Sequence, residues 1–433
     1  MRQHSLWALT AALLLCACGP GGQAPFQVVV LVYSPESGAY EPRTVTLTTP
    51  TDIRKLQGSV AKLIGGAKFN VDEVTASTID EARQQVTRNP GGDVNASYIE
   101  SQGALVPADF HSLNMATTYY NLERAHDFFT NKIGGTLTES RFGVPNVYYF
   151  PEFVENGVAQ PDNAMFWALI KGFLILPFEQ LQQVPMGINQ GIVGHEYGHA
   201  VFSYNVDGSN PDPPIVKSWL GDFGATPGAN LLSALEEGSA DLFGVGVTCS
   251  DDLLSCDPSF MSASLPPEDG ETRRIDTPQC MDEGMWNNLE TETHDEFFNR
   301  CRPYGCAYRV GSVFASAMWA AGRDAAVVGA LGQTGARRQM FQALWNAQSG
   351  AGGEPGLRPW GDLMEAATIQ SQFSLKKQAG SNLPTVLDAV IDGATDPTLK
   401  AALCGAFMDR FYLARSQFAH CPATAQSMNE CKR

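Results

Sequence analysis

The chain has 433 residues, of which 44% are hydrophobic and 17% charged, enough for one large domain or two medium ones with a hydrophobic core. This composition excludes an intrinsically disordered chain, which would be poorer in hydrophobic residues. The net charge of −17 argues against a nucleic-acid-binding protein, because such proteins need a basic surface for the phosphates.

The first 25 residues are expected to direct export and not to join the fold. Arg2 supplies a positive charge, and Leu6 to Leu15 is an almost wholly apolar run that is too short to span a bilayer. The segment that follows, Leu15-Cys16-Ala17-Cys18-Gly19, resembles the lipobox of bacterial lipoproteins, whose signal peptide is cleaved before a cysteine that becomes lipidated. The resemblance implies a signal peptide at 1–17, a lipid on Cys18 and a polar tether at 18–25.

Gly19 follows Cys18 where inner-membrane lipoproteins carry an aspartate, so the same resemblance implies an outer-membrane lipoprotein. The alternative is an ordinary secretory signal that contains a cysteine by chance. No later stretch is apolar enough to be a membrane span, so a lipid anchor is the only membrane contact expected.

Beyond the tether, the hydrophobic pattern predicts a β-rich first part and a mostly helical second part that begins near residue 187. Loops rich in Gly, Pro and Asp are expected at 205–228, 249–284 and 348–360. The predicted elements of the first part are strands at 26–33 and 43–48, a helix at 78–86, a helix at 115–130, and strands at 147–150 and 164–176.

Cysteine usage agrees with export. An even number of cysteines in an exported protein predicts disulfides, although their pairing stays open. No two of them have CxxC spacing, so a cysteine zinc site is not expected. The eight that remain after the signal peptide and Cys18 are Cys249, Cys256, Cys280, Cys301, Cys306, Cys404, Cys421 and Cys431.

The motif that carries chemistry is His195-Glu196-Tyr197-Gly198-His199. Apolar residues at helical spacing surround it, so His195 and His199 are predicted to lie one turn apart on one face of a helix. Two imidazoles in this arrangement can bind one zinc ion, and Glu196 beside them can take a proton from an attacking water molecule. The alternative is a helix with two incidental histidines.

A third ligand is needed, and a second helix offers it. Metzincins continue the motif with a further glycine and histidine, but Phe202 and Asn205 occupy those places. Glu237 and Asp241 are four residues apart on a predicted apolar helix. Glu237 can bind zinc while Asp241 accepts a hydrogen bond from a ligand histidine and fixes its tautomer. Glu236 lacks a carboxylate partner at that spacing, and a solvated acidic helix is the alternative.

These two segments resemble the thermolysin-like gluzincin metallopeptidases, and the tyrosine of the histidine motif is similar to that of their fungalysin-like relatives. The resemblance covers about residues 110–345 and implies an α+β fold of two lobes, β-rich and helical, with the cleft between them. It implies an N-terminal lobe with the zinc helix at 111–205 and a helical C-terminal lobe with the third ligand at 206–433. Residues 26–110 would be an accessory β-rich region.

The same resemblance assigns substrate-binding residues. Asn163 and the main chain of Ala164 match the edge strand that holds a peptide backbone in these enzymes by strand addition. Arg273 matches an arginine that orients the ligand glutamate and the substrate carbonyl. The alternatives are an ordinary core strand and a surface arginine.

The resemblance breaks at the oxyanion site. Family members place a histidine shortly before a helix like 311–319, and here the matching residue is Tyr308. A phenol can also donate a hydrogen bond to an oxyanion, and His294 is the other candidate donor. The second donor of the family, a tyrosine before the glutamate helix, has no counterpart at 230–234.

The sequence therefore predicts a zinc endopeptidase that acts on protein or peptide substrates, with one catalytic zinc ion. The altered oxyanion residues motivate the alternative of a binding or scaffold lipoprotein with weak or no activity, and a zinc exopeptidase ranks last. The acidic clusters at 282–283 and 290–296 could bind calcium, but a solvated acidic face explains them as well.

Overall fold

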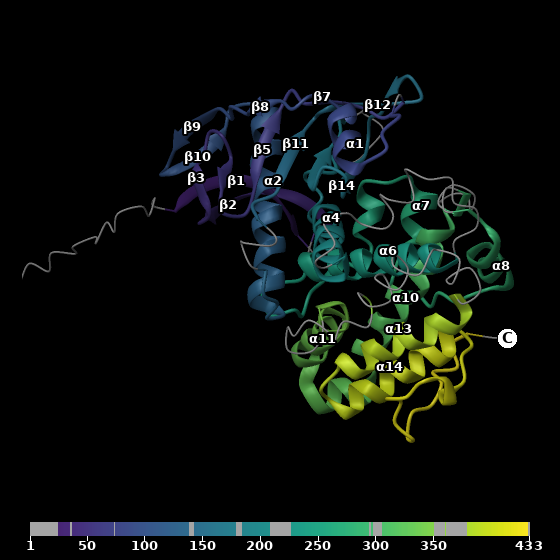
Figure 1. The fold of residues 1–433 in the computed structure, drawn as a ribbon. Helices are drawn as coiled ribbons and strands as arrows, with labels where there is room; N and C mark the ends of the chain where they lie inside the picture. The colour runs from purple at the N-terminus through teal and green to yellow at the C-terminus, as the bar shows by residue number, and fades with distance from the viewer. Residues whose placement is uncertain are drawn as a thin grey trace, which may run out of the picture.

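The computed structural model describes residues 25–431 except for 35–36, 73, 138–142, 179–183, 208–226, 294–295, 298–304, 350–359 and 361–378. The protein is α+β, as predicted, with several sheets in the first part of the chain and helices in the second. Figure 1 shows the strands gathered at the top of the view and helices α13 and α14 at the bottom, with α4 and α6 between them.

The strands form three sheets. In the first the order is β2 (Ala39–Leu47), β1 (Phe26–Ser34), β10 (Ala104–Pro107) and β9 (Tyr98–Ser101). In the second it is β14 (Ala164–Trp167), β15 (Gly172–Ile175), β11 (Asn146–Tyr149), β5 (Lys62–Gly65), β4 (Gln57–Gly58) and β3 (Pro50–Asp52), and β8 (Gly92–Asp93) pairs with β5. In the third it is β13 (Val158–Ala159), β12 (Glu152–Glu155), β6 (Lys68–Asn70) and β7 (Thr87–Asn89).

Two of these sheets join residues 26–110 to residues 111–205. Strand β5 pairs in parallel with β11, so that Leu63 lies opposite Val147, and β6 pairs in parallel with β12, so that Phe69 lies opposite Phe153. The boundary expected near residue 110 therefore runs through two shared sheets. The reason is that parallel pairing joins strands far apart in sequence, which local hydrophobic patterns do not report.

The helices and helical turns are α1 (Ile79–Val86), α2 (Phe110–Asp127), η1 (Phe128–Lys132), α4 (Gln190–Phe202), η2 (Ser203–Asp207), α6 (Pro227–Thr248), η3 (Phe260–Ala263), α7 (Pro267–Thr272), α8 (Glu283–Thr291), α10 (Cys306–Gly322), α11 (Ala325–Ser349), α13 (Ala379–Gly393), α14 (Pro397–Arg410) and η6 (Arg415–Gln417). Among the described residues, no helix combines the length and the apolar character needed to cross a membrane.

The centre of the molecule is formed by α4 and α6, which cross in close contact. A Cβ atom on Gly198 would lie 2.9 Å from the Cα of Ala240, so a glycine is required where the two backbones meet. Helix α2 covers another side of α4, and the Asn121 amide donates hydrogen bonds to the carbonyls of Gly187 and Ile188 at 3.1 and 3.0 Å. This packing holds the histidine motif against the helix that carries the third candidate ligand.

The predicted disulfides are present. The bonds join Cys249 to Cys256, Cys280 to Cys431, and Cys404 to Cys421. Cys306 is also disulfide-bonded, and Cys301 lies outside the described residues.

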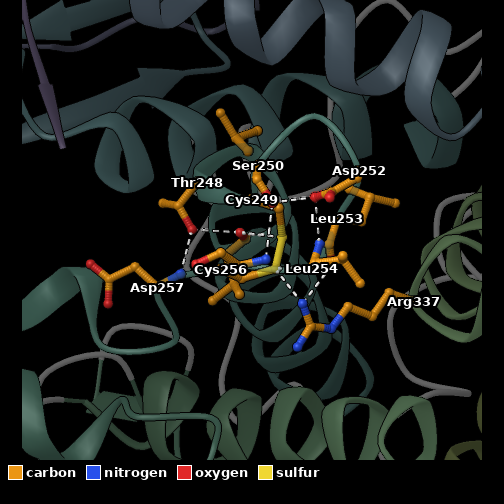
Figure 2. Close-up of a disulfide and its surroundings, with 12 residues drawn as sticks. Thr248, Cys249, Ser250, Asp252, Leu253, Leu254, Cys256, Asp257 and Arg337 are labelled. Atoms are coloured by element: carbon orange, nitrogen blue, oxygen red, sulfur yellow. Dashed lines mark hydrogen bonds between the residues drawn. A yellow bond between two sulfur atoms is a disulfide. The ribbon is translucent and has the colours of Figure 1, made fainter. Parts of the chain in front are cut away.

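The Cys249–Cys256 loop fastens the end of α6 to α2 and α11. Figure 2 shows the Arg337 guanidinium directed at this loop, where Nη1 donates to the Leu253 carbonyl and lies 3.2 Å from Cys256 Sγ. On the other side, Arg124 of α2 donates to the Cys249 carbonyl at 2.9 Å. The loop therefore bridges three helices at the end of α6.

Candidate metal centre

Helix α4 is largely buried and carries the two histidines of the motif, His195 and His199. The Asn189 side chain caps the helix by accepting hydrogen bonds from the main-chain N–H groups of Gly191 and Ile192. Almost every residue of the helix is buried. His195 and His199 lie one turn apart, as predicted, and their Nε2 atoms are 3.1 Å from each other.

Helix α6 brings Glu237 to the same point. Glu237 Oε2 lies 3.5 Å from His195 Nε2 and 3.6 Å from His199 Nε2. Burial alone would raise the pKa of Glu237, but the charges of His199 and Arg273 outweigh it, so the pKa is lowered and the carboxylate stays ionised. The three predicted ligands therefore form a buried group that could hold a metal ion.

The far nitrogen of each imidazole meets a carboxylate. His195 Nδ1 lies 3.0 Å from Asp241 Oδ1, and His199 Nδ1 lies 3.0 Å from Glu236 Oε1. A neutral imidazole that donates a proton from Nδ1 has a lone pair on Nε2. When both imidazoles are neutral in this tautomer, the two Nε2 atoms and the Glu237 oxygen are three acceptors that face one another, a set that a cation stabilises. Burial would lower the pKa of His199, but the charges of Glu237 and Glu236 raise it well above its usual value, so without a metal ion a proton on His199 supplies that positive charge.

Arg273 ties the acidic residues of α6 together. Its Nη2 donates to Asp241 Oδ1 at 2.6 Å and to Glu237 Oε2 at 3.3 Å, and its Nε donates to Asp241 Oδ2 at 3.2 Å. The contact with Glu237 is the one expected from the sequence resemblance. Burial would raise the pKa of Asp241, but the charge of Arg273 lowers it, so this carboxylate is also ionised.

Glu196 lies beside the cluster and is held by the edge of a sheet. Its Oε2 accepts a hydrogen bond from the main-chain N–H of Phe166 in β14 at 2.6 Å, while Oε1 lies 3.9 Å from His195 Nε2. Burial raises the pKa of Glu196, and the neighbouring histidines offset only part of this effect. A carboxylate with a raised pKa is a better proton acceptor near neutral pH than an ordinary one.

Among the described residues, β14 is an edge strand of the second sheet; Ala164 is its first residue and Asn163 directly precedes it. In an antiparallel pair, successive residues direct their main-chain groups alternately towards the partner strand and away from it. The Phe166 N–H points away from β15, and the Asn163 carbonyl points towards it, since it accepts from the Leu176 N–H. Ala164 therefore turns both of its main-chain groups to the open edge, and the Asn163 side chain is exposed.

Tyr308 is near the cluster, at the first turn of α10. The guanidinium carbon of Arg273 lies 4.5 Å from the centre of its ring. The negative charge of Glu237, together with burial and the charge of Glu196, raises the pKa of Tyr308 well above its usual value. The phenol therefore keeps its proton and can act as a hydrogen-bond donor.

Two predicted residues, Cys18 and His294, lie outside the described part of the chain. The acidic stretch at 282–283 has a structural function, because Asp282 caps α8 by accepting from the Met285 N–H at 2.7 Å. Within the described ranges, the only group of three or more His, Cys, Asp or Glu side chains arranged for a metal ion is His195, His199 and Glu237.

The sequence missed two parts of the site. Glu236 had no partner on its own helix, yet it contacts His199 of α4. The Phe166 N–H that holds Glu196 is a main-chain group and leaves no signature in side-chain identity. No protein-family model matches the chain, and a search of the curated proteins found no match either.

Proposed function

We propose that the protein is an exported zinc metalloendopeptidase, in which His195, His199 and Glu237 hold the metal and Glu196 is the general base. The observation that carries the proposal is the joint placement of a buried glutamate and an open strand edge at one metal-binding group. Glu196 is not needed to hold a metal ion, but peptide hydrolysis needs a base at this position. The hydrogen bond from Phe166 ties that base to the strand where a peptide would lie.

The spacing of the three ligand atoms favours zinc. With bonds of about 2.0–2.1 Å, two ligands of a tetrahedral ion are about 3.3 Å apart. The three separations of 3.1, 3.5 and 3.6 Å lie around this value. Two imidazole nitrogens and one carboxylate oxygen are a donor set typical of catalytic zinc, whereas calcium prefers oxygen ligands alone.

The mechanism then follows from the residues around the site. When bound, zinc supplies Lewis-acid polarisation of a carbonyl and lowers the pKa of water. An extended peptide adds to β14 by hydrogen bonding to both main-chain groups of Ala164. Glu196 takes the proton of the attacking water and passes it to the leaving amine. The Tyr308 hydroxyl donates to the oxyanion that forms on the substrate carbonyl.

This assignment goes with a thermolysin-like arrangement of two lobes, with a β-rich lobe that ends in α4 and a helical lobe that carries α6. An N-terminal lipid anchor on Cys18 would place the enzyme at the outer membrane. The competing function is a binding or scaffold lipoprotein that retains the metal but does not cleave. The observation that favours it is Tyr308, which stands where the thermolysin-like enzymes that the sequence resembles use a histidine.

Zinc content and cleavage of a broad peptide library distinguish the two, with the mature native protein compared with its Glu196→Gln and Tyr308→Phe variants. We expect all three to bind one zinc ion, Glu196→Gln to be inactive, and Tyr308→Phe to lose about 10²–10³ in kcat. A native protein that binds zinc but cleaves no peptide would establish the scaffold function. A native protein that binds no zinc would refute both.

A further inference from the structure

The two candidate histidine ligands have unequal surroundings. The Nδ1 atom of each is 3.0 Å from a carboxylate, Asp241 for His195 and Glu236 for His199. The Asp241 side chain is 1% exposed and is paired with Arg273 at 2.6 Å. The Glu236 side chain is 20% exposed, and among the described residues its one ion-pair partner is His199 itself. The charge of Asp241 is thus offset by Arg273, whereas Glu236 is paired with no described Lys or Arg side chain.

This difference in pairing changes the electrostatic environment of each imidazole. A carboxylate that accepts from Nδ1–H fixes the tautomer and makes Nε2 a stronger donor to a cation. Asp241 lies 3.0 Å from His195 Nδ1, and its charge is offset by its pairing with Arg273. Glu236 adds a negative charge near the cluster that is paired with no described Lys or Arg side chain. Once His199 is a neutral ligand, the field of this charge acts on the ion that the cluster holds.

The number of carboxylates around the cluster also indicates that the charge of Glu236 affects the binding of a dication. Four carboxylates, those of Glu196, Glu236, Glu237 and Asp241, lie within this site. Arg273 contacts two of them, Glu237 and Asp241, and the other basic partners among the described residues are the two histidines, which are neutral when they bind a metal ion. A divalent cation reduces the mutual repulsion of these carboxylates. Removal of one charge from this set should therefore weaken the binding of a dication.

We propose that Glu236 is a positioning residue for His199 and that its uncompensated negative charge sets the affinity of the centre for a divalent cation. The inference rests on the metal centre of the proposed function, but not on catalysis. Glu236 does not belong to the three ligand residues. It acts through the imidazole of His199, at the rim of the site, where it is more exposed than Glu237, whose side chain is 9% exposed.

Three substitutions distinguish the effect of the Glu236 charge from the effect of its contact with His199. Glu236→Gln keeps the length of the side chain and an acceptor oxygen but removes the charge. Glu236→Asp keeps the charge but is one methylene shorter. Glu152→Gln is the matched control, because Glu152 is an exposed carboxylate on β12 that is paired with Lys68. It changes the net charge of the protein by the same amount without a contact to the site.

The measurement is the zinc dissociation constant of the mature protein by competition with a chelator, together with the visible spectrum of the cobalt(II)-loaded protein. We expect Glu236→Gln to weaken zinc binding by about 10–100-fold and to alter the cobalt spectrum. We expect Glu236→Asp to weaken binding less than Glu236→Gln, and Glu152→Gln to match the native protein. Thermal unfolding in EDTA should be alike for Glu236→Gln and the control.

Equal zinc affinity for Glu236→Gln and the native protein would overturn the inference. A Glu236→Asp variant that binds as weakly as Glu236→Gln would overturn the role of the charge. If Glu236→Gln unfolds in EDTA at a lower temperature than the control, and its weaker zinc binding is explained by this loss of folded protein, Glu236 has only a structural role. If the predicted affinities are found but no peptide is cleaved, the peptidase proposal fails and this inference stands.

Discussion

The crossing of α6 and α10 beside Glu237 leaves no room for a side chain on either helix. A Cβ atom on Gly238 would lie 2.3 Å from the carbonyl oxygen of Gly311 and 3.0 Å from its Cα. A Cβ atom on Gly311 would lie 2.7 Å from the Ala234 carbonyl oxygen. The obstacles are backbone atoms on both helices, which cannot move aside as a flexible side chain can.

Gly238→Ala should therefore separate the two helices. A carbon atom and a carbonyl oxygen in contact are usually about 3.3 Å apart, so the helices must move by about 1 Å. Such overpacking costs about 1–3 kcal/mol of folding free energy. The same movement would carry Tyr308 on α10 away from Glu237 on α6. A displacement of 1 Å between groups that act together can lower the rate by about 10²-fold.

The assay combines thermal unfolding with peptide cleavage under zinc saturation. The matched control is Gly329→Ala in α11, where a Cβ atom would meet nothing within 4 Å. We expect the control to be as stable as the native protein or slightly more stable, because alanine favours a helix more than glycine. If Gly238→Ala is as stable and as active as this control, the close crossing and the reasoning built on it are wrong.

Two further predictions concern stability alone. Burial raises the pKa of Asp257, so its charged form is disfavoured in the folded protein. Asp257→Asn should therefore raise the melting temperature at pH 8, and the gain should disappear below about pH 4, where the carboxyl is protonated in folded and unfolded protein; an equal gain at both pH values would contradict this. The bond between Cys280 and Cys431 joins residues 151 positions apart, and the chain-entropy argument gives about 5 kcal/mol for such a loop. Denaturant unfolding of the double Cys→Ala variant should show a loss of this order, and a loss below about 1 kcal/mol would contradict it.

Local patterns in the sequence were enough to predict the group of residues that could hold a metal ion. His195 and His199 are four residues apart, and a helix turns residues at this spacing to one side. Glu237 and Asp241 obey the same rule, and the structure places both at the histidines. The period-two pattern in the first part of the chain and the helical spacing in the second also predicted a β-rich part followed by a mostly helical one.

Other features of the fold and of the site depend on contacts between segments that are far apart in the sequence. The expected boundary near residue 110 was drawn from local pattern, yet β5 and β11 pair across it. A parallel pair of this kind is decided by packing over a long connection, and neither strand alone reports it. The Phe166 N–H that holds Glu196 depends in the same way on the approach of an edge strand to α4.

Glu236 is a residue of the site that helical spacing in the sequence could not identify and that the tertiary structure did identify. On its own helix it has no partner, so a rule based on residue spacing leaves it out. In the folded protein α4 crosses α6 where Gly198 lets the backbones approach, and this crossing brings His199 to Glu236. The sequence by itself determined which side chains share a face of one helix, because the helical repeat is a local property of the backbone. Only the tertiary structure decided which faces meet, because close packing between helices depends on the shapes of both surfaces together.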